Sequence, residues 1–226
     1  SKTVIGSVLM VQFPSLRTIM WGIIMLSVYQ LKAHFQDILR PVCGVLATRN
    51  ITANHVTLFA LYTSILYGIV LSCDVRIFWI LLPLFLVFRM ALNAIDGMLA
   101  REFGMKSKLG MALNEVGDVL SDTALFIPFI FFAPQAAWIV ALFIYLAALS
   151  EMCGVVGFMM SGKRCYDGPM GKSDRAVATG ALGFLIGVGL VSSKGIGAVF
   201  LILSILTVWS CVNRIRSAIR REEEEQ

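Results

Sequence analysis

Polar side chains gather in residues 93–122, a stretch that lies between strongly apolar runs. Ionisable groups beside membrane-spanning segments are costly, so they mark a functional site by default. The stretch also holds a cation, Arg101, and small residues that let a backbone or a ligand approach closely. Outside the connection over 102–109, its acids are Asp96, Glu115, Asp118 and Asp122, and its amides are Asn93 and Asn114.

The spacing of these side chains predicts two helix faces that carry oxygen atoms. Asn93 and Asp96 are three residues apart, and Asn114 and Asp118 are four apart. Each pair therefore lies on one face of its helix. Residues 102–109 form a short polar connection, so we expect antiparallel helices whose oxygen-bearing faces meet.

Such a meeting of oxygen atoms predicts a site for a divalent metal. Carboxylate and amide oxygens suit a hard cation, Mg2+ or Mn2+, better than Zn2+, and residues 93–122 contain no Cys or His. A hard cation beside Arg101 and small residues suits a diphosphate substrate, because the metal would neutralise charge that develops on the phosphoryl group.

The same stretch resembles the signature of the CDP-alcohol phosphatidyltransferases. That signature reads Asp, two residues, Asp-Gly, two residues, Ala-Arg, eight residues, Gly, three residues, Asp, three residues, Asp, and the chain follows it at six positions. It departs at Asn93 and Asn114, where the family has its first and third acids. The resemblance covers roughly residues 30–218 and points to a bacterial inner-membrane branch of the family. The matching residues are Asp96, Gly97, Ala100, Arg101, Gly110 and Asp118.

The resemblance implies a reaction and a role for each residue. Family members transfer a phosphatidyl group from CDP-diacylglycerol to an alcohol and release CMP, so we expect a phosphotransferase of phospholipid synthesis. Asp118 aligns with the proposed general base of the family. The implied metal ligands are Asn93, Asp96, Asn114 and Asp118, and the implied CDP-binding residues are Asn54, Thr57, Gly97, Ala100, Arg101 and Gly110.

Two of these assignments have alternatives that the sequence leaves open. Asn54 and Thr57 fit a helix cap as well as a nucleotide site. Asn93 and Asn114 offer amide oxygens but no charge, and they cannot take a proton. Four carboxylates would balance two divalent metals, so either other acids such as Asp122 supply charge or one metal is weak or absent.

A second polar cluster precedes a later apolar run. Lys172 and Arg175 are three residues apart and follow a Gly-rich segment, a combination that suits a phosphate. By resemblance they would bind a phosphorylated acceptor, although charge on the cytoplasmic side of a membrane is the simpler explanation. Arg89 lies within an apolar run, so we expect it to pair inside the bundle, with Glu151 as the candidate partner.

Composition predicts an integral membrane protein. The 226 residues are 58% hydrophobic and 15% charged. We expect an all-α fold with six transmembrane helices plus an N-terminal amphipathic interfacial helix. The predicted spans are 53–73, 76–101, 109–133, 135–161, 174–192 and 195–217. The expected regions are an uncertain extension over 1–28, the interfacial helix over 29–50, the membrane domain over 51–218 and an acidic tail over 219–226.

Basic residues predict the orientation. With six spans both ends share a side, which holds fourteen Lys and Arg residues, and the other side holds Arg76 and Lys194. The positive-inside rule then places the signature on the cytoplasmic side of the membrane. The resemblance implies that this membrane is a bacterial inner membrane. The expected partners are CDP-diacylglycerol, an alcohol or phospho-alcohol acceptor and membrane lipids, with no nucleic acid. Family members are often homodimers, a state that these residues neither indicate nor exclude.

Two other classes of function remain. A degenerate family member would bind CDP-lipid without turnover because two metal ligands have lost their charge. A small ion-coupled transporter would use its buried acids to carry protons or ions, but the six matched signature positions argue against it. We also disfavour Asp96 and Asp118 as mere ion-pair partners, since only Arg101 lies close to them in the sequence.

Overall fold

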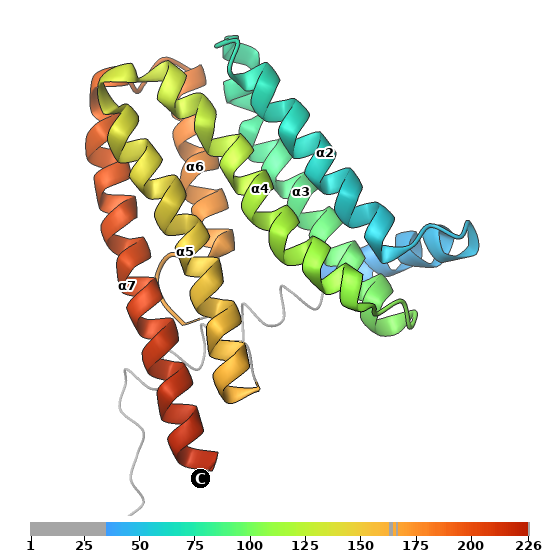
Figure 1. Ribbon diagram of the computed structural model, residues 1–226. Coiled ribbons are helices and arrows are strands. Elements are labelled where there is room, and N and C mark those ends of the chain that lie inside the picture. Colours follow the sequence, from blue (N-terminus) through green and yellow to red (C-terminus); the bar gives the residue numbers. More distant parts are fainter. Residues whose placement is uncertain (1–34, 163–164, 166, 226) are drawn as a thin grey trace, which may run out of the picture.

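All regular structure in the described part of the chain is helical (Figure 1). The computed structural model describes residues 35–162, 165 and 167–225. The extension expected over 1–28 and the first residues of the 29–50 helix lie outside this part. The elements are a helix over 35–48, α2 (Ala53–Leu71), α3 (Arg76–Glu102), α4 (Lys108–Phe132), the 3-10 helix η1 (Pro134–Ala136), α5 (Ala137–Ser161), α6 (Lys172–Gly187) and α7 (Ser193–Glu225).

Most predicted helix boundaries agree with these elements, and two differ. The fifth predicted span was expected to reach 192, but α6 ends at Gly187. Gly189 has a left-handed backbone with φ of 81°, a conformation that ends helices. The last predicted span was expected to end at 217, but α7 continues into the acidic residues as far as Glu225.

Polar side chains fix the beginnings of α2 and α4. Thr52 caps α2, because its hydroxyl accepts a hydrogen bond from the His55 backbone N–H, and His55 Nδ1 accepts one from the Thr52 N–H. Ser107 caps α4 by accepting a hydrogen bond from the Gly110 N–H at 2.9 Å. Since Thr52 is the cap, the capping alternative for Asn54 and Thr57 is wrong.

Three helix pairs form the bundle. α5 packs along α7, α2 along α4, and α3 along α6, as Figure 1 shows for the first two pairs. α2 also packs against α3, so it contacts both helices that carry the signature. A Cβ atom on Gly68 would lie 2.2 Å from the backbone oxygen of Ala124, so only glycine permits the close approach of α2 to α4.

Two apolar clusters pack between the helices. The larger one is centred on Trp79, Phe129, Phe143 and Phe200, which are almost fully buried. Their rings stack edge to face, with centroids 4.9 Å apart for Trp79 and Phe129. The smaller cluster joins the helix over 35–48 to the first turns of α2 and the last turns of α3, so it lies at the same level as the polar signature.

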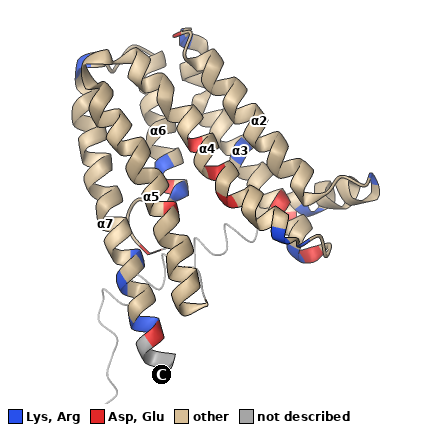
Figure 2. Ribbon diagram, in the orientation of Figure 1, with Lys and Arg blue, Asp and Glu red and all other residues tan. Residues whose placement is uncertain are grey.

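Four helical segments are long and apolar enough to cross a membrane, which supports an integral membrane protein. They are Ala53–Leu71, Arg76–Glu102, Pro134–Ser161 and Ser193–Glu222. α4 carries three acids in its sequence and α6 has only 16 residues, so for these two helices the expected crossing stays a prediction. Figure 2 shows few Lys and Arg residues at the end of the bundle opposite the α3–α4 turn.

The helix over 35–48 carries apolar side chains both toward the bundle and toward the outside, so its expected amphipathic character is not confirmed. Cys43 and Leu46 point into the smaller apolar cluster, whereas Ile38, Val42 and Val45 are exposed. Arg40 attaches the helix to α3 through Glu102, with 3.0 Å between Nε and Oε2. Hydrogen bonds to Glu102 and Asp37 raise the pKa of Arg40 above its ordinary value. Its place in a membrane interface stays a prediction.

Candidate active site

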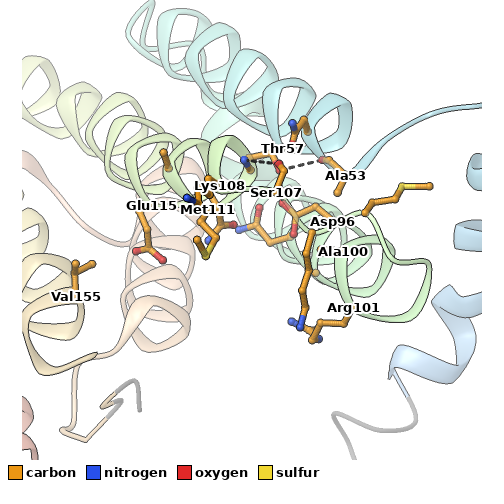
Figure 3. A pocket seen from close by; sticks show the side chains of 18 of the residues that line it. Ala53, Thr57, Asp96, Ala100, Arg101, Ser107, Lys108, Met111, Glu115 and Val155 are labelled. Atoms are coloured by element: carbon orange, nitrogen blue, oxygen red, sulfur yellow. Dashed lines mark hydrogen bonds between the residues drawn. The ribbon is translucent and has the colours of Figure 1, made fainter. Parts of the chain in front are cut away.

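A cavity of about 1030 Å³ lies between α2, α3 and α4 and reaches α5 on its far side (Figure 3). Figure 3 shows Thr57 and Asp96 at one wall, Glu115 across from them, and Arg101 toward the open side. The lining includes all six residues expected to bind CDP and three of the four expected metal ligands. These residues are Asn54, Thr57, Gly97, Ala100, Arg101 and Gly110, together with Asn93, Asp96 and Asn114.

The cavity exists because α3 and α4 face each other without packing closely. The turn between the two helices includes Gly104, whose φ of 70° suits glycine. α2 packs against both α3 and α4. Polar side chains bridge the space between α3 and α4. The Nδ2 atom of Asn93 on α3 donates to Oδ1 of Asp118 on α4 at 3.3 Å. The expectation that the two oxygen-bearing faces meet is confirmed.

Asp96 is buried at the wall of the cavity and is held by α2. Its Oδ2 atom accepts a hydrogen bond from Thr57 Oγ1 at 2.8 Å, and only 5% of the residue is exposed. Asn54, one helical turn before Thr57, lies against the start of α4. A Cβ atom on Gly110 would be 2.6 Å from Asn54 Oδ1, so glycine at this position leaves room for the amide.

Asp118 lies where α3, α4 and α6 converge, and its carboxylate faces two cations. Lys172 Nζ forms an ion pair with Oδ1, and Arg89 Nη2 lies 3.8 Å from the same oxygen. Asn93 also donates to Oδ1. The other oxygen, Oδ2, accepts no hydrogen bond from the described residues. One carboxylate oxygen is therefore committed to protein donors, and the other is left for a ligand or a proton.

An ion-pair network extends from Asp118 into the core of the bundle. Asp122 accepts from Arg89 at 2.6 Å and from Arg175 at 3.1 Å. Arg175 also donates to Glu151 at 2.7 Å, and Arg214 lies 3.6 Å from the same carboxylate. Each buried charge is thus balanced within the protein, as burial demands.

This network corrects three expectations. Arg89 pairs with Asp122 and not with Glu151, whose partners are Arg175 and Arg214. Asp122 is held between two guanidinium groups, so it is not an additional metal ligand. Asp118 and Asp122 also have protein cations as partners, and a bound metal is not needed to explain their burial. Asp96 differs, because the described residues place no cation within ion-pair distance of it.

A second cavity, of about 170 Å³, adjoins Asp118 between α3 and α6. Arg89, Asn93, Lys172 and Ser173 line it, together with apolar residues of α3 and α6. The expected role of Lys172 at an anionic acceptor stays a prediction. Arg175 does not take the place expected for it, because its side chain is fully buried in the network and lines neither cavity.

Arg89 is the residue whose place at the site was missed. It was expected only as a structural partner inside the bundle. A signal for its role exists in the sequence, since Arg89, Asn93 and Asp96 are spaced four and three residues apart on one face of α3. Lys106, Ser107 and Lys108 also line the large cavity, so the polar turn contributes to the site itself.

The donor set can be tested against a divalent cation. No group of three or more His, Cys, Asp or Glu residues in the described ranges could hold a metal ion. A cation would instead be bound by the carboxylates of Asp96 and Asp118 with the amide oxygens of Asn93 or Asn114 and those of a substrate. Oxygen atoms of this kind fit Mg2+ or Mn2+, which commonly share their coordination with substrate phosphates.

Comparison of the sequence with known proteins identifies its family. Residues 50–210 match the sequence profile of the CDP-alcohol phosphatidyltransferases, and the chain belongs to this family. It is 42% identical to the inner membrane protein YnbA of Escherichia coli (strain K12) over 200 residues, which are 88% of this chain and 100% of YnbA. The expected resemblance to a bacterial inner-membrane branch is confirmed.

Solved structures show the same fold at low sequence identity. The phosphatidylinositol phosphate synthase of Mycobacterium tuberculosis with CDP-DAG bound superposes with a TM-score of 0.63 at 18% identity, covering 80% of this chain and 94% of that chain. The same synthase in complex with manganese and citrate gives a TM-score of 0.66 at 17% identity, covering 79% and 88%. At this identity the likeness concerns the fold.

Proposed function

We propose that this protein transfers a phosphatidyl group from CDP-diacylglycerol to an anionic alcohol and releases CMP. One observation carries the proposal. Five of the six matched signature positions line the large cavity. The sixth, Asp118, lies between that cavity and the small cavity with cationic walls. Family membership and the fold shared with a synthase that binds CDP-DAG support it.

The large cavity would take the CDP group and the adjoining part of the lipid. Arg101, Lys106 and Lys108 supply positive charge at its wall for a diphosphate. Gly97 and Gly110 leave room for the nucleotide. Apolar lining from Met111, Val155 and Phe158 lies where the lipid portion would leave toward the membrane.

Asn93, Asp96, Asn114 and Asp118 are the residues that would hold a Mg2+ or Mn2+ ion, which would neutralise charge on the diphosphate and on the departing CMP. The crystal structure of the Mycobacterium tuberculosis synthase with manganese supports a divalent metal in this fold. Asp96 is oriented for such a role by its hydrogen bond from Thr57.

The transfer step would place the acceptor hydroxyl next to Asp118. The acceptor oxygen forms a bond to the lipid-linked phosphorus, and the bond between this phosphorus and the oxygen of CMP breaks. The electron pair leaves with CMP. The acceptor proton passes to Asp118, whose Oδ2 atom is free of hydrogen bonds to the described residues.

The small cavity would select an anionic acceptor, such as glycerol phosphate or inositol phosphate. Arg89 and Lys172 face a volume of about 170 Å³, and Ser173 adds a hydroxyl donor. Arg89 replaces Arg175 in this proposal, since Arg89 lines the small cavity and Arg175 lines neither cavity. Arg175 would act by holding Asp122 and thereby Arg89 in place.

A direct assay tests the proposal. Purified protein would be supplied with CDP-diacylglycerol, Mn2+ and a panel of acceptors with and without a phosphate group, and CMP release would be measured. We expect release with a phosphorylated acceptor and a loss of about 10²- to 10⁴-fold in Asp118→Asn, the typical range for a general base. Release that Asp118→Asn leaves unchanged would contradict the assignment.

A second candidate, binding of CDP-lipid without turnover, is favoured by two features of the site. Two signature acids are amides, and the Lys172 ammonium group already pairs with Asp118. The same assay separates the two candidates, because this one requires saturable binding of CDP-diacylglycerol with no release of CMP for any acceptor.

We also propose that α4 and α6 cross the membrane with the other four helices, and that the α3–α4 turn faces the cytoplasm. The buried network satisfies the charges of both helices inside the bundle, which makes their crossing affordable. Arg175 and Arg214 belong to this network and not to loops, so they are no longer counted among the basic residues that the positive-inside rule compares. The remaining basic residues still favour the side of the turn.

A further inference from the structure

The charges at the signature positions set how much metal the site can hold. Only Asp96 and Asp118 are acids there, because Asn93 and Asn114 replace the other two acids. Two carboxylates neutralise one divalent cation. An amide can donate an oxygen to a metal, but it adds no charge to compensate a second ion in a partly buried site.

Lys172 already contacts the carboxylate that a second ion would need. It is the first residue of α6, and its Nζ atom pairs with Oδ1 of Asp118. A cation at a helix N-terminus is disfavoured by the helix dipole, so this position requires a compensating anion. Asp118 supplies it across the space between α4 and α6.

The amide of Asn93 is also turned to suit this arrangement. A carboxylate can only accept hydrogen bonds, so the contact at 3.3 Å from Asn93 to Asp118 presents the amide nitrogen. Lys172 and Asn93 therefore both act on Oδ1 as donors. A carboxylate at position 93 would repel Asp118 unless a cation lay between them, whereas the amide binds it directly.

The balance of charge in the linked network agrees with a single ion. The cations of the network are Arg89, Lys172, Arg175 and Arg214. Its anions are Asp118, Asp122 and Glu151, and Asp96 at the cavity wall is counted with them. The two sets are equal in number. One divalent cation that enters with a dianionic diphosphate keeps the region neutral, whereas a second divalent cation would leave an uncompensated excess.

Building on the proposed function, we propose that the site takes one divalent cation and that the Lys172 ammonium group supplies the positive charge of a second one. Lys172 is then a cation fixed by the fold, which holds Asp118 on one side and faces the small cavity on the other. Binding of a second metal and the presence of Lys172 should exclude each other.

The test counts Mn2+ ions bound to the full chain in detergent, by the electron paramagnetic resonance signal of free Mn2+ and by calorimetry, with CDP-diacylglycerol present. We expect one ion per chain in the wild type and in Lys172→Arg, which keeps the charge. Asn93→Asp/Asn114→Asp restores the acids, and adding Lys172→Met should tighten a second Mn2+ by about tenfold or more, since an ammonium group within 4 Å of the ligand is removed.

Lys194→Met is the matched control, because Lys194 begins the last helix outside the network and is exposed. Added to Asn93→Asp/Asn114→Asp, it should leave the Mn2+ affinities unchanged. Two ions in the wild type, or a second ion whose affinity Lys172→Met does not alter, would overturn the inference. One bound ion without CMP release from any acceptor would leave it standing and remove the proposed transfer. CMP release with two bound ions would overturn the inference and leave the proposed transfer standing.

Discussion

Single atoms decide how the polar residues divide their work. Oδ1 of Asp118 contacts Lys172 and Asn93, whereas Oδ2 accepts no hydrogen bond from the described residues. Arg175 has the right charge and spacing for a phosphate, yet its guanidinium is spent on Asp122 and Glu151. Charge and spacing nominate a residue, but its available hydrogen-bonding groups determine what it can still bind.

Gly110→Ala tests the nucleotide end of the large cavity. The new methyl group would lie 2.6 Å from Asn54 Oδ1, so the amide must move away from the cavity wall. Loss of about one hydrogen bond to the nucleotide should raise KM for CDP-diacylglycerol about tenfold and leave KM for the acceptor unchanged. The measurement is steady-state CMP release with each substrate varied.

The control is Gly44→Ala, because a methyl group at Gly44 meets nothing within 4 Å. An unchanged KM for the CDP-lipid in Gly110→Ala would show that Asn54 does not contact the nucleotide.

Helix pairs, more than single helices, position the site. α2 carries Asn54 and Thr57, and it packs against both α3 and α4. It therefore sets the width of the space between α3 and α4. The helix over 35–48 packs against the first turns of α2 and the last turns of α3 through the smaller apolar cluster.

Gly68→Ala should disturb the α2–α4 pair directly. The Cβ atom would lie 2.2 Å from the backbone oxygen of Ala124, which has no rotamer to adopt, so the helices must separate. We expect a destabilisation of about 1–3 kcal/mol, as for other overpacked interiors. The decrease in thermal unfolding midpoint in detergent, followed by circular dichroism, measures it, and Gly44→Ala again provides the comparison. An unchanged midpoint would mean that α2 and α4 are less tightly packed than the structure indicates.

At the scale of the whole molecule, the polar groups of the site and the large aromatic cluster lie toward opposite ends of the bundle. The larger aromatic cluster fills the half away from the α3–α4 turn, and the cavities and the ion-pair network open toward the turn. This arrangement suits a water-soluble nucleotide and acceptor that arrive from the side of the turn while the lipid chains remain in the membrane.

Cysteine labelling tests the proposed orientation. Cys73 is exposed just beyond α2, at the end of the bundle opposite the signature turn. A maleimide that cannot cross the inner membrane should label Cys73 in intact bacterial cells whose outer membrane has been made permeable. Lys106→Cys in a Cys73→Ser background should react only after lysis, because Lys106 lies in the signature turn. The opposite pattern would place the site outside the cytoplasm.

The sequence by itself determined the helices, the class of the protein and the residues of the large cavity. These follow from local information, since apolar runs set the helices and fixed spacing along two helices sets which side chains share a face. For the same reason, the six expected CDP-binding residues all line the cavity.

Only the tertiary structure decided the partners of the buried charges. Arg175 and Asp122 are 53 residues apart, and Arg89 and Asp122 are 33 apart. Helical periodicity says which face a charge occupies, but not which helix of the bundle stands opposite. The order in which α3, α4, α5, α6 and α7 pack assigns Arg175 to the core and Lys172 to Asp118, because a buried charge pairs with whatever opposite charge the packing brings within reach.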